Sequence, residues 1–167
     1  MPKGIALLIT ALLLSACSAG RTVPATSGSP GFTPLQLAKT DIDRVAEAQQ
    51  REIFANLKVL AEKLYRRNPR ELRKSGRSDI AIALDRVFYG NHHWGFPELN
   101  GARDIHAIHL AFREEYQGDR VLAFVAGVAS MIQTAFNNKT EFYVTDDLDP
   151  QRLYNAARNV EIAVWML

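Results

Sequence analysis

Apolar residues recur at helical spacing along most of the chain beyond residue 39, and this pattern predicts an all-α domain. Between 40 and 65, apolar side chains three, four or seven positions apart share one face of a long helix: Ile42, Ala46, Ile53, Leu57, Leu60 and Leu64. The segment 119–136 is apolar on nearly every side, which is typical of a helix that others surround. We therefore expect a compact bundle of about five helices around this central helix.

Capping residues and helix breakers mark the other elements. We expect a short helix from Asn68-Pro69 to Ser75-Gly76, a helix over 79–88 capped by Ser78, a helix over 102–116, and a final helix that begins at Asp149-Pro150. The loop over 89–99 gathers the side chains of Tyr89, Trp94, Phe96 and Pro97. These either form an exposed recognition surface or close one end of the helical core.

The N-terminus has the pattern of a secretory signal. Lys3 precedes an uncharged run from Ile5 to Leu14, which is about half of the ~20 residues that span a bilayer. The run ends in Leu14-Ser15-Ala16-Cys17, which resembles the lipobox of bacterial lipoproteins. The alternative is an ordinary secretory signal whose apolar run happens to end at a cysteine.

The lipobox resemblance carries several expectations. It implies cleavage before Cys17, attachment of a diacylglyceryl group to the Cys17 sulfur, and acylation of the new amino group by a chain such as palmitate. Two or three such chains make a stable membrane anchor, whereas one binds only marginally. Because Ser18, and not an aspartate, follows the cysteine, the resemblance points to the outer membrane, with the protein facing the periplasm.

The chain divides into three parts. Residues 1–16 are the expected signal peptide. Residues 17–38 are the lipidated cysteine and a tether, rich in Pro, Gly, Ser and Thr, which we expect to be flexible. Residues 39–167 are the helical domain. Through the lipobox and the segment 63–71, the chain resembles small helical lipoproteins of proteobacteria to which no activity has been assigned, and this resemblance carries no functional residues across.

Composition narrows the function classes. The chain has 20 Lys+Arg against 18 Asp+Glu, and this formal charge of +2 gives no support to nucleic-acid binding. A single cysteine excludes an intramolecular disulfide and a cysteine-based zinc cluster. The sequence contains no Gly-rich phosphate loop and no G-x-S-x-G motif. We therefore assign no catalytic residue and no cofactor.

All four histidines lie between positions 92 and 109. On a helix His106 and His109 project about 60° apart, and Asp104 completes the pattern D-x-H-x-x-H. Imidazoles with a carboxylate can bind zinc and activate its water, so His92, His93, Asp104, His106 and His109 could form a hydrolase site. Against this, His109 falls on an apolar stripe where a buried histidine is commoner, and the pattern lacks the glutamate of HExxH.

A basic segment follows the first helix. It holds Lys63, Arg66, Arg67, Arg70, Arg73, Lys74 and Arg77, with Glu71 as its one acid. Guanidinium groups suit phosphate and carboxylate, so the segment either binds anionic headgroups or acidic cell-wall groups, or is a solvated surface. An acidic counterpart could pair with it within the fold or between copies: Glu141, Asp146, Asp147 and Asp149.

The C-terminal helix has an apolar last turn, with Trp165 and Leu167 and without a glycine cap. Either this end docks into the core, or the chain is shorter than the domain from which it derives or lacks a partner helix. We favour the second interpretation, which predicts concentration-dependent self-association of residues 39–167 through this helix, relieved by Trp165→Lys.

The sequence thus predicts a non-enzymatic envelope lipoprotein. Its lipid would hold a helical binding or scaffold module at the periplasmic face of the outer membrane, where the module binds an envelope protein or a cell-wall component. The alternatives are a metal-dependent hydrolase that uses the histidine region, and a carrier of an apolar ligand inside the bundle.

Overall fold

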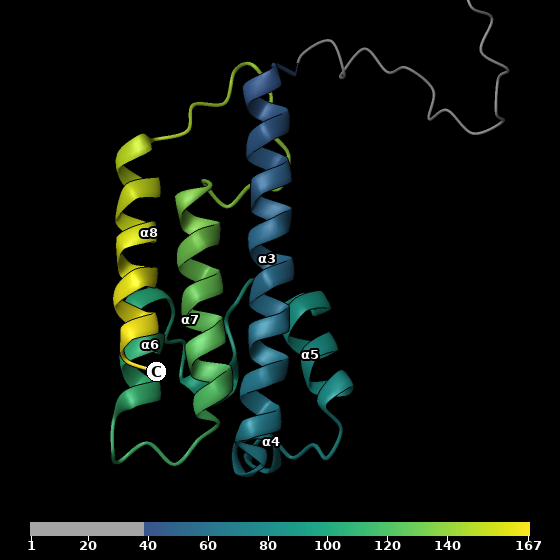
Figure 1. Ribbon diagram of the computed structural model, residues 1–167, viewed down its shortest axis with the longest axis vertical. Helices are drawn as coiled ribbons and strands as arrows, with labels where there is room; N and C mark the ends of the chain where they lie inside the picture. Colours follow the sequence, from purple (N-terminus) through teal and green to yellow (C-terminus); the bar gives the residue numbers. More distant parts are fainter. Residues whose placement is uncertain (1–38) are drawn as a thin grey trace, which may run out of the picture. The chain divides into compact units, whose positions relative to one another are not determined.

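The computed structural model describes residues 39–167, and these residues form helices without any strand (Figure 1). The helices are α3 (Asp41–Arg67), α4 (Pro69–Lys74), α5 (Ile80–Tyr89), α6 (Asp104–Phe112), α7 (Arg120–Ala135) and α8 (Pro150–Trp165), with a 3-10 turn η1 at Pro97–Leu99. The all-α prediction is confirmed, with six α-helices in this part of the chain instead of about five. The predicted signal peptide, lipidation site and tether lie outside the described residues.

Helix α7 is the centre of the domain, as its sequence predicts. Of its sixteen residues only Arg120, Gln133 and Thr134 are not buried. Helix α6 packs along one side of α7, while α3 and α8 pack on it from two other directions. Within 39–167, no helix is both long and apolar enough to cross a membrane.

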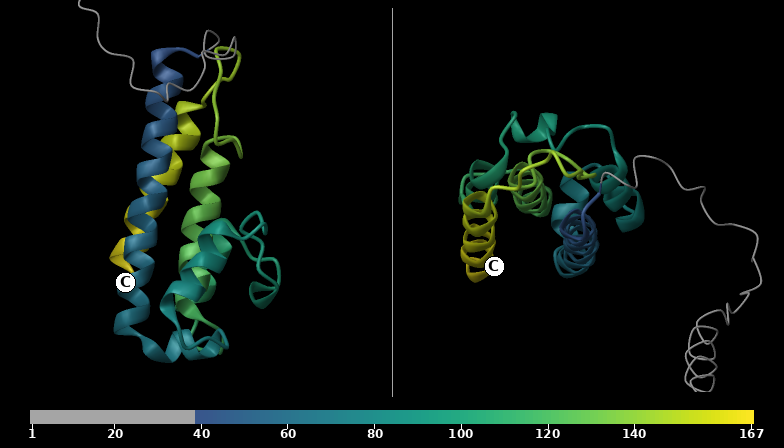
Figure 2. Two further views of the ribbon diagram at one scale, coloured as in Figure 1. Left: turned by 90° about the vertical axis from the view of Figure 1, so that its right-hand side faces the viewer. Right: turned by 90° about the horizontal axis from the view of Figure 1, so that it is seen from above.

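Helices α3 and α8 run in the same direction on either side of α7, which runs the opposite way (Figure 1). Seen along the helix axes, α3 and α8 project from the same side of α7, whereas α6 lies beside α7 and behind α8 (Figure 2). Helices α4 and α5 both pack against α3. The domain therefore has a covered side behind α7 and a side on which α3 and α8 are the outermost helices.

Helix starts follow local capping, with one correction. Thr40 and Asp43 form a capping box at the start of α3, and Asp149 caps α8 by accepting the N–H of Gln151 at 2.8 Å. The predicted cap of α5 at Ser78 is wrong. The Asp79 carboxylate accepts the N–H groups of Ala81 and Ile82, so the helix begins one residue later.

The end of α6 also differs from its prediction. The helix stops at Phe112, four residues before the predicted end, and the chain continues as a loop to α7. The Arg120 guanidinium, at the start of α7, donates hydrogen bonds to the carbonyls of Ala111, Glu114 and Tyr116 at 2.9–3.0 Å. These carbonyls would accept backbone N–H groups if α6 continued, and here they accept the guanidinium instead. The bonds also hold the loop between α6 and α7 in one conformation.

Small residues on α7 let α6 approach closely. A Cβ added to Gly127 would lie 2.7 Å from Ile108 Cγ1 and 2.8 Å from the Asp104 carbonyl. Ser130 lies one turn further along, and its hydroxyl accepts the Asp104 N–H at 2.7 Å while donating to the Ala126 carbonyl. The α6–α7 contact therefore depends on the absence of a side chain at Gly127.

Candidate functional site

An open groove of about 710 Å³ lies beside α3. We call it the aromatic groove, because four rings line it: Phe54 from α3, Phe88 and Tyr89 from α5, and Trp94 from the following loop. Its other lining residues are Glu47, Gln50, Arg51, Ala55 and Lys58 of α3, Gln133 of α7, and Thr140 and Glu141. A groove of this size is in the range of small-molecule and peptide sites.

Trp94 is held in place by the other rings. Its indole stacks on Phe54 with centroids 5.5 Å apart and planes 9° from parallel, and it meets Phe88 edge-on at 6.0 Å. Offset stacking and edge contacts of this kind favour one orientation of each ring. The groove therefore presents preorganised aromatic surface instead of mobile side chains.

The loop that carries Trp94 is unusual in its backbone. His93 and Trp94 both have positive φ, 47° and 61°, a region that side chains other than glycine rarely occupy. His92 stabilises the turn, because its Nδ1 accepts the Trp94 N–H at 2.9 Å and its Nε2 lies 3.0 Å from the carbonyls of Arg86 and Val87. Backbone strain of this kind clusters at functional sites.

The structure divides the aromatic loop residues between the core and the surface. Phe96 is 2% exposed and closes the core, whereas Tyr89 is 74% exposed and Trp94 is half-buried against the groove. Two further groove residues, Phe54 and Lys58, were not predicted from the sequence. They lie one turn apart on α3, beside the apolar stripe, and only the position of the distant loop shows their role.

One rim of the groove is a lysine–tyrosine pair. The Lys58 ammonium lies 4.4 Å from the centre of the Tyr89 ring and 3.2 Å from the Tyr89 hydroxyl, with the Asp85 carboxylate 3.6 Å away. The hydrogen bond to Tyr89, helped by the negative charge of Asp85, raises the pKa of Lys58 above its usual value. Lys58 therefore stays a cation at this rim.

The opposite rim is built around Glu47, which is 8% exposed. Its Oε1 accepts hydrogen bonds from the Lys39 ammonium at 2.6 Å and from the Phe142 N–H at 2.9 Å. Burial alone would raise the pKa of Glu47, but the Lys39 and Phe142 hydrogen bonds and the charge of Arg51 outweigh it and lower that pKa. Glu47 therefore stays ionised and fastens the segment before α8 to α3.

A second hollow lies next to the aromatic groove. It measures about 350 Å³ and shares Phe88 and Trp94 with the groove, so Trp94 borders both spaces. Arg103 lines this hollow, and its Nε is buried without a hydrogen-bond partner in the described domain. This N–H is therefore an unsatisfied polar group beneath the surface of the hollow.

The histidine candidates are spread out. His106 and His109 are exposed on α6, so the prediction of a buried His109 is wrong; the residues that α6 buries are Ala107, Ile108 and Ala111. His92 uses both ring nitrogens in the loop contacts described above. Among residues 39–167, no group of three or more His, Cys, Asp or Glu side chains is arranged to hold a metal ion.

The basic segment forms one end of the domain. We define the basic end by its six exposed cations: Lys63, Arg66, Arg67, Arg70, Arg73 and Lys74. Arg77, also predicted there, is half-buried and donates to the Ser75 carbonyl at 2.7 Å. Arg66 pairs with Glu62 at 2.7 Å on the same helix.

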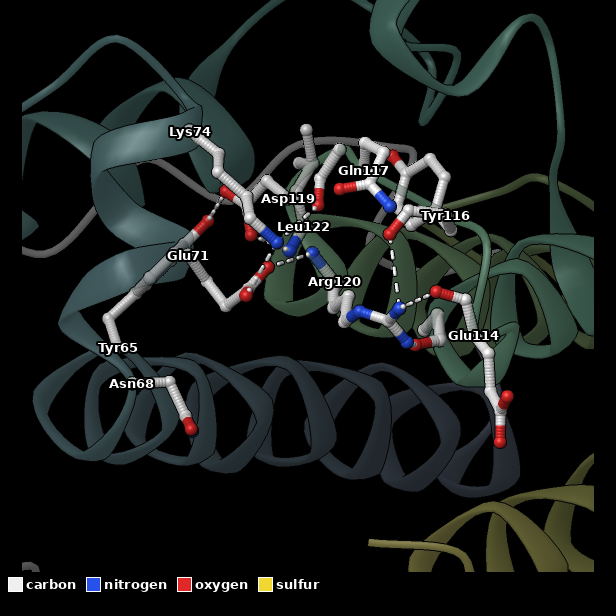
Figure 3. A network of polar contacts seen from close by, with 12 residues as sticks. Tyr65, Asn68, Glu71, Lys74, Glu114, Tyr116, Gln117, Asp119, Arg120 and Leu122 are labelled. Carbon is white, nitrogen blue, oxygen red and sulfur yellow. Dashed lines mark hydrogen bonds and ion pairs between the residues drawn. The ribbon is translucent and has the colours of Figure 1, made fainter.

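A polar network holds the basic end against the start of α7 (Figure 3). Glu71 accepts the Lys74 ammonium at 2.8 Å and, through its other oxygen, the Arg120 N–H at 2.8 Å. Beside it, the buried Tyr65 hydroxyl donates to the Asp119 carboxylate at 2.8 Å, and Asp119 caps α7. Helix α4, with its cations Arg70, Arg73 and Lys74, is therefore held against the start of α7.

The acidic counterpart lies at the other end. We define the acidic end by Glu141, Asp146, Asp147 and Asp149, which belong to the segment between α7 and α8. That segment runs past the N-terminus of α3, whereas the basic end surrounds the C-terminus of α3 (Figure 1). The two clusters therefore do not pair within one chain, and Asp146 instead pairs with Lys139.

Comparison with known proteins gives no relative: no protein-family model, no curated protein and no solved structure matches the chain. The aromatic groove, the two charged ends and the helical fold are therefore the observations from which a function can be proposed.

Proposed function

We propose that the chain is a lipid-anchored envelope lipoprotein that acts as a non-enzymatic binding module, with the aromatic groove as its ligand site. The observation that carries this proposal is the groove itself: about 710 Å³ of open space along four aromatic rings. Concave, largely apolar sites with a few polar groups at their rims are where proteins bind ligands.

The groove favours a particular ligand chemistry. The stacked Trp94 and Phe54 rings offer a rigid apolar surface, which suits a flat or cyclic apolar group. The Lys58 ammonium at the rim offers a charged hydrogen-bond donor. The matching ligand has an apolar face and at least one acceptor or anionic group, as fragments of envelope polymers and extended peptides do.

Charge states in the groove support binding over catalysis. A general acid or base works best with a pKa near the operating pH. The pKa of Glu47 is lowered and that of Lys58 is raised, so both groups are held in their charged forms and away from neutrality. Their contacts act instead to fix the groove walls.

The anchor half of the proposal rests on the resemblance at Leu14-Ser15-Ala16-Cys17. We predict that the wild-type protein takes up labelled palmitate and appears in detergent-extracted outer membrane, and that Cys17→Ala abolishes both. Label on the alanine variant, or none on the wild type, would contradict lipid anchoring.

The binding half is tested by crosslinking in the cell. A photo-crosslinking amino acid at Tyr89 lies on the groove rim, and the matched control position is Tyr154, which is 65% exposed on α8 outside the groove. We expect a discrete adduct from position 89, identified by mass spectrometry, that is lost when Trp94→Ala is added. The same adduct from both positions, or an adduct that survives Trp94→Ala, would contradict ligand binding in the groove.

A further inference from the structure

Helices α3 and α8 leave an apolar surface on the side away from α6, which we call the α3–α8 face. On α3, the stripe that the sequence predicts to be buried is only partly covered: Ile42 is 76% exposed, Ile53 is 37% exposed, and Leu60 and Leu64 are half-buried. Ile42 and Ile53 therefore correct the expectation that this whole stripe faces the core. The stripe lies on the opposite side of α3 from the aromatic groove, which begins at Phe54.

Helix α8 contributes a matching stripe. Leu153, Val160 and Val164 follow one another at steps of seven and four residues, so they share one side of the helix, and Leu167 lies just beyond its end. Val164 is 52% exposed and Leu167 is 57% exposed. The residues that α8 buries are two alanines, Ala156 and Ala163. Leu153 and Val160 pack partly against the core, so the apolar surface that the domain leaves uncovered lies toward the end of α8.

The two stripes border a common hollow. A cavity of about 380 Å³ is lined on its apolar side by Leu64 of α3, Phe124 of α7 and the last two residues of the chain. It is also lined by Ala111 and Phe112 of α6 and by the polar side chains of Asn68, Glu71 and Arg120. Seen from above, α3 and α8 stand forward on the two sides of α7 (Figure 2). Exposed apolar side chains of α3 and α8 therefore lie on the two sides of α7, and this cavity marks one end of the face between them.

We infer that a second copy of this chain covers the α3–α8 face, with a two-fold axis perpendicular to the helices. In this arrangement each α3 lies antiparallel to the other α3, and each α8 to the other α8. A two-fold interface uses the same patch on both copies, so one apolar face is enough to form it. The inference is independent of any ligand in the aromatic groove.

Charge complementarity selects the antiparallel arrangement. The basic end and the acidic end lie at opposite ends of α3 (Figure 1). A perpendicular two-fold axis brings the basic end of each copy to the acidic end of the other, while an axis along the helices would place like charges together. Arg67, Arg70 and Arg73 make no ion pair within the described domain, and Asp147 makes none either, so these charges are available to a partner.

The size of the face sets the expected strength. Helix α8 has sixteen residues, which at 1.5 Å per residue gives a contact about 24 Å long. A surface of that length and two helices wide covers roughly 500 Å² per copy, below the ~800 Å² of standard stable interfaces. We therefore expect weak association, which the membrane anchor of the proposed function would promote by confining both copies to one surface.

The test uses disulfide crosslinking of the full-length protein in membranes. Ile53 lies near the middle of α3, so the two-fold axis places it close to the same residue of the second copy. Cys17 is the only native cysteine. Ile53→Cys should give a covalent dimer on mild oxidation, several-fold more than the matched control Val59→Cys, which is 48% exposed on another side of α3. Co-expression of two tagged forms of the variant establishes that the product joins two copies.

Charge reversal tests the orientation. Arg67→Glu in the Ile53→Cys background should lower the dimer yield several-fold, and adding Asp147→Lys should restore it, while far-ultraviolet circular dichroism stays unchanged. Equal yields at positions 53 and 59, no dimer at either, or a crosslink from position 53 to a different protein would overturn the inference. Failure of Asp147→Lys to restore the yield would overturn the antiparallel arrangement.

Discussion

Replacing Tyr65 by phenylalanine removes a single buried hydrogen bond and leaves the packing of the ring unchanged. Tyr65 is 2% exposed, and its hydroxyl donates to Asp119 Oδ2 at 2.8 Å. In the variant, Asp119 Oδ1 still accepts the Leu122 N–H at 2.9 Å. Asp119 Oδ2 loses the phenol donor and is buried without another one. A hydrogen bond to a charged group contributes about 1.5–3 kcal/mol. We therefore expect Tyr65→Phe to lower the free energy of unfolding by that amount.

The chain offers a matched control. The Tyr116 hydroxyl is also buried, but it has no hydrogen-bond partner among the described residues. Tyr116→Phe deletes the same atom without deleting a bond, so it should be neutral or slightly stabilising. Urea unfolding followed by circular dichroism measures both; at about 3–5 °C per kcal/mol, the Tyr65 variant should also melt roughly 5–15 °C lower. Equal effects of the two substitutions would refute the assignment of this bond.

The same pair predicts a pH dependence. Burial, together with the negative charge of Asp119, raises the pKa of Tyr65 well above its usual 10.0. Above about pH 10 the unfolded chain releases the phenolic proton while the folded chain retains it, so the folded state binds more protons and stability falls as the pH rises. The Tyr65→Phe variant has no phenol at this position, so its stability lacks this pH dependence. The stability gap between wild type and variant should therefore narrow between pH 8 and pH 10.5, and a constant gap would count against the raised pKa.

Two further predictions concern helix packing and acid stability. Gly127→Ala places a methyl group 2.7 Å from Ile108 and should lower the free energy of unfolding in urea by about 1–3 kcal/mol. The control is Gly95→Ala, whose Cβ would meet only the His92 carbonyl at 3.4 Å. It should lower the free energy of unfolding by less than about 0.5 kcal/mol. The pKa of Glu47 is lowered in the folded state, so the stability that its charge contributes is complete above pH 4.5 and is lost as the pH falls through the folded-state pKa. Glu47→Gln should therefore be less stable than the wild type at pH 7. It should also lose less stability than the wild type on acidification to pH 3.

Local patterns predicted the helices well, because the signals for them are local. The Asp149-Pro150 start of α8 and the apolar run of α7 each depend on residues within one or two turns, and both predictions are confirmed. The early end of α6 was not predictable in this way. It depends on Arg120, eight residues beyond Phe112, which reaches back to the loop carbonyls.

The groove was less predictable than the helices for the same reason. The sequence identifies Trp94 and Tyr89 as aromatic residues of one loop. It does not identify Phe54, which stacks on Trp94 from a position forty residues earlier in the chain. Ile42 shows the opposite failure. Its spacing fits the apolar stripe of α3, yet no other element of the described domain covers it, and it is 76% exposed. Periodicity assigns residues to one side of a helix, whereas tertiary contacts decide how much of that side is covered.

The contrast between α7 and α8 has a consequence for how the domain opens. Thirteen residues of α7 are buried, against two alanines of α8, so releasing α8 exposes far less apolar surface than releasing α7. Backbone amides in α7 should therefore exchange with deuterium only through global unfolding, while those of α8 should exchange through a cheaper local opening. A domain built in this way can loosen its last helix, rearrange or exchange it, and close again while its centre stays folded.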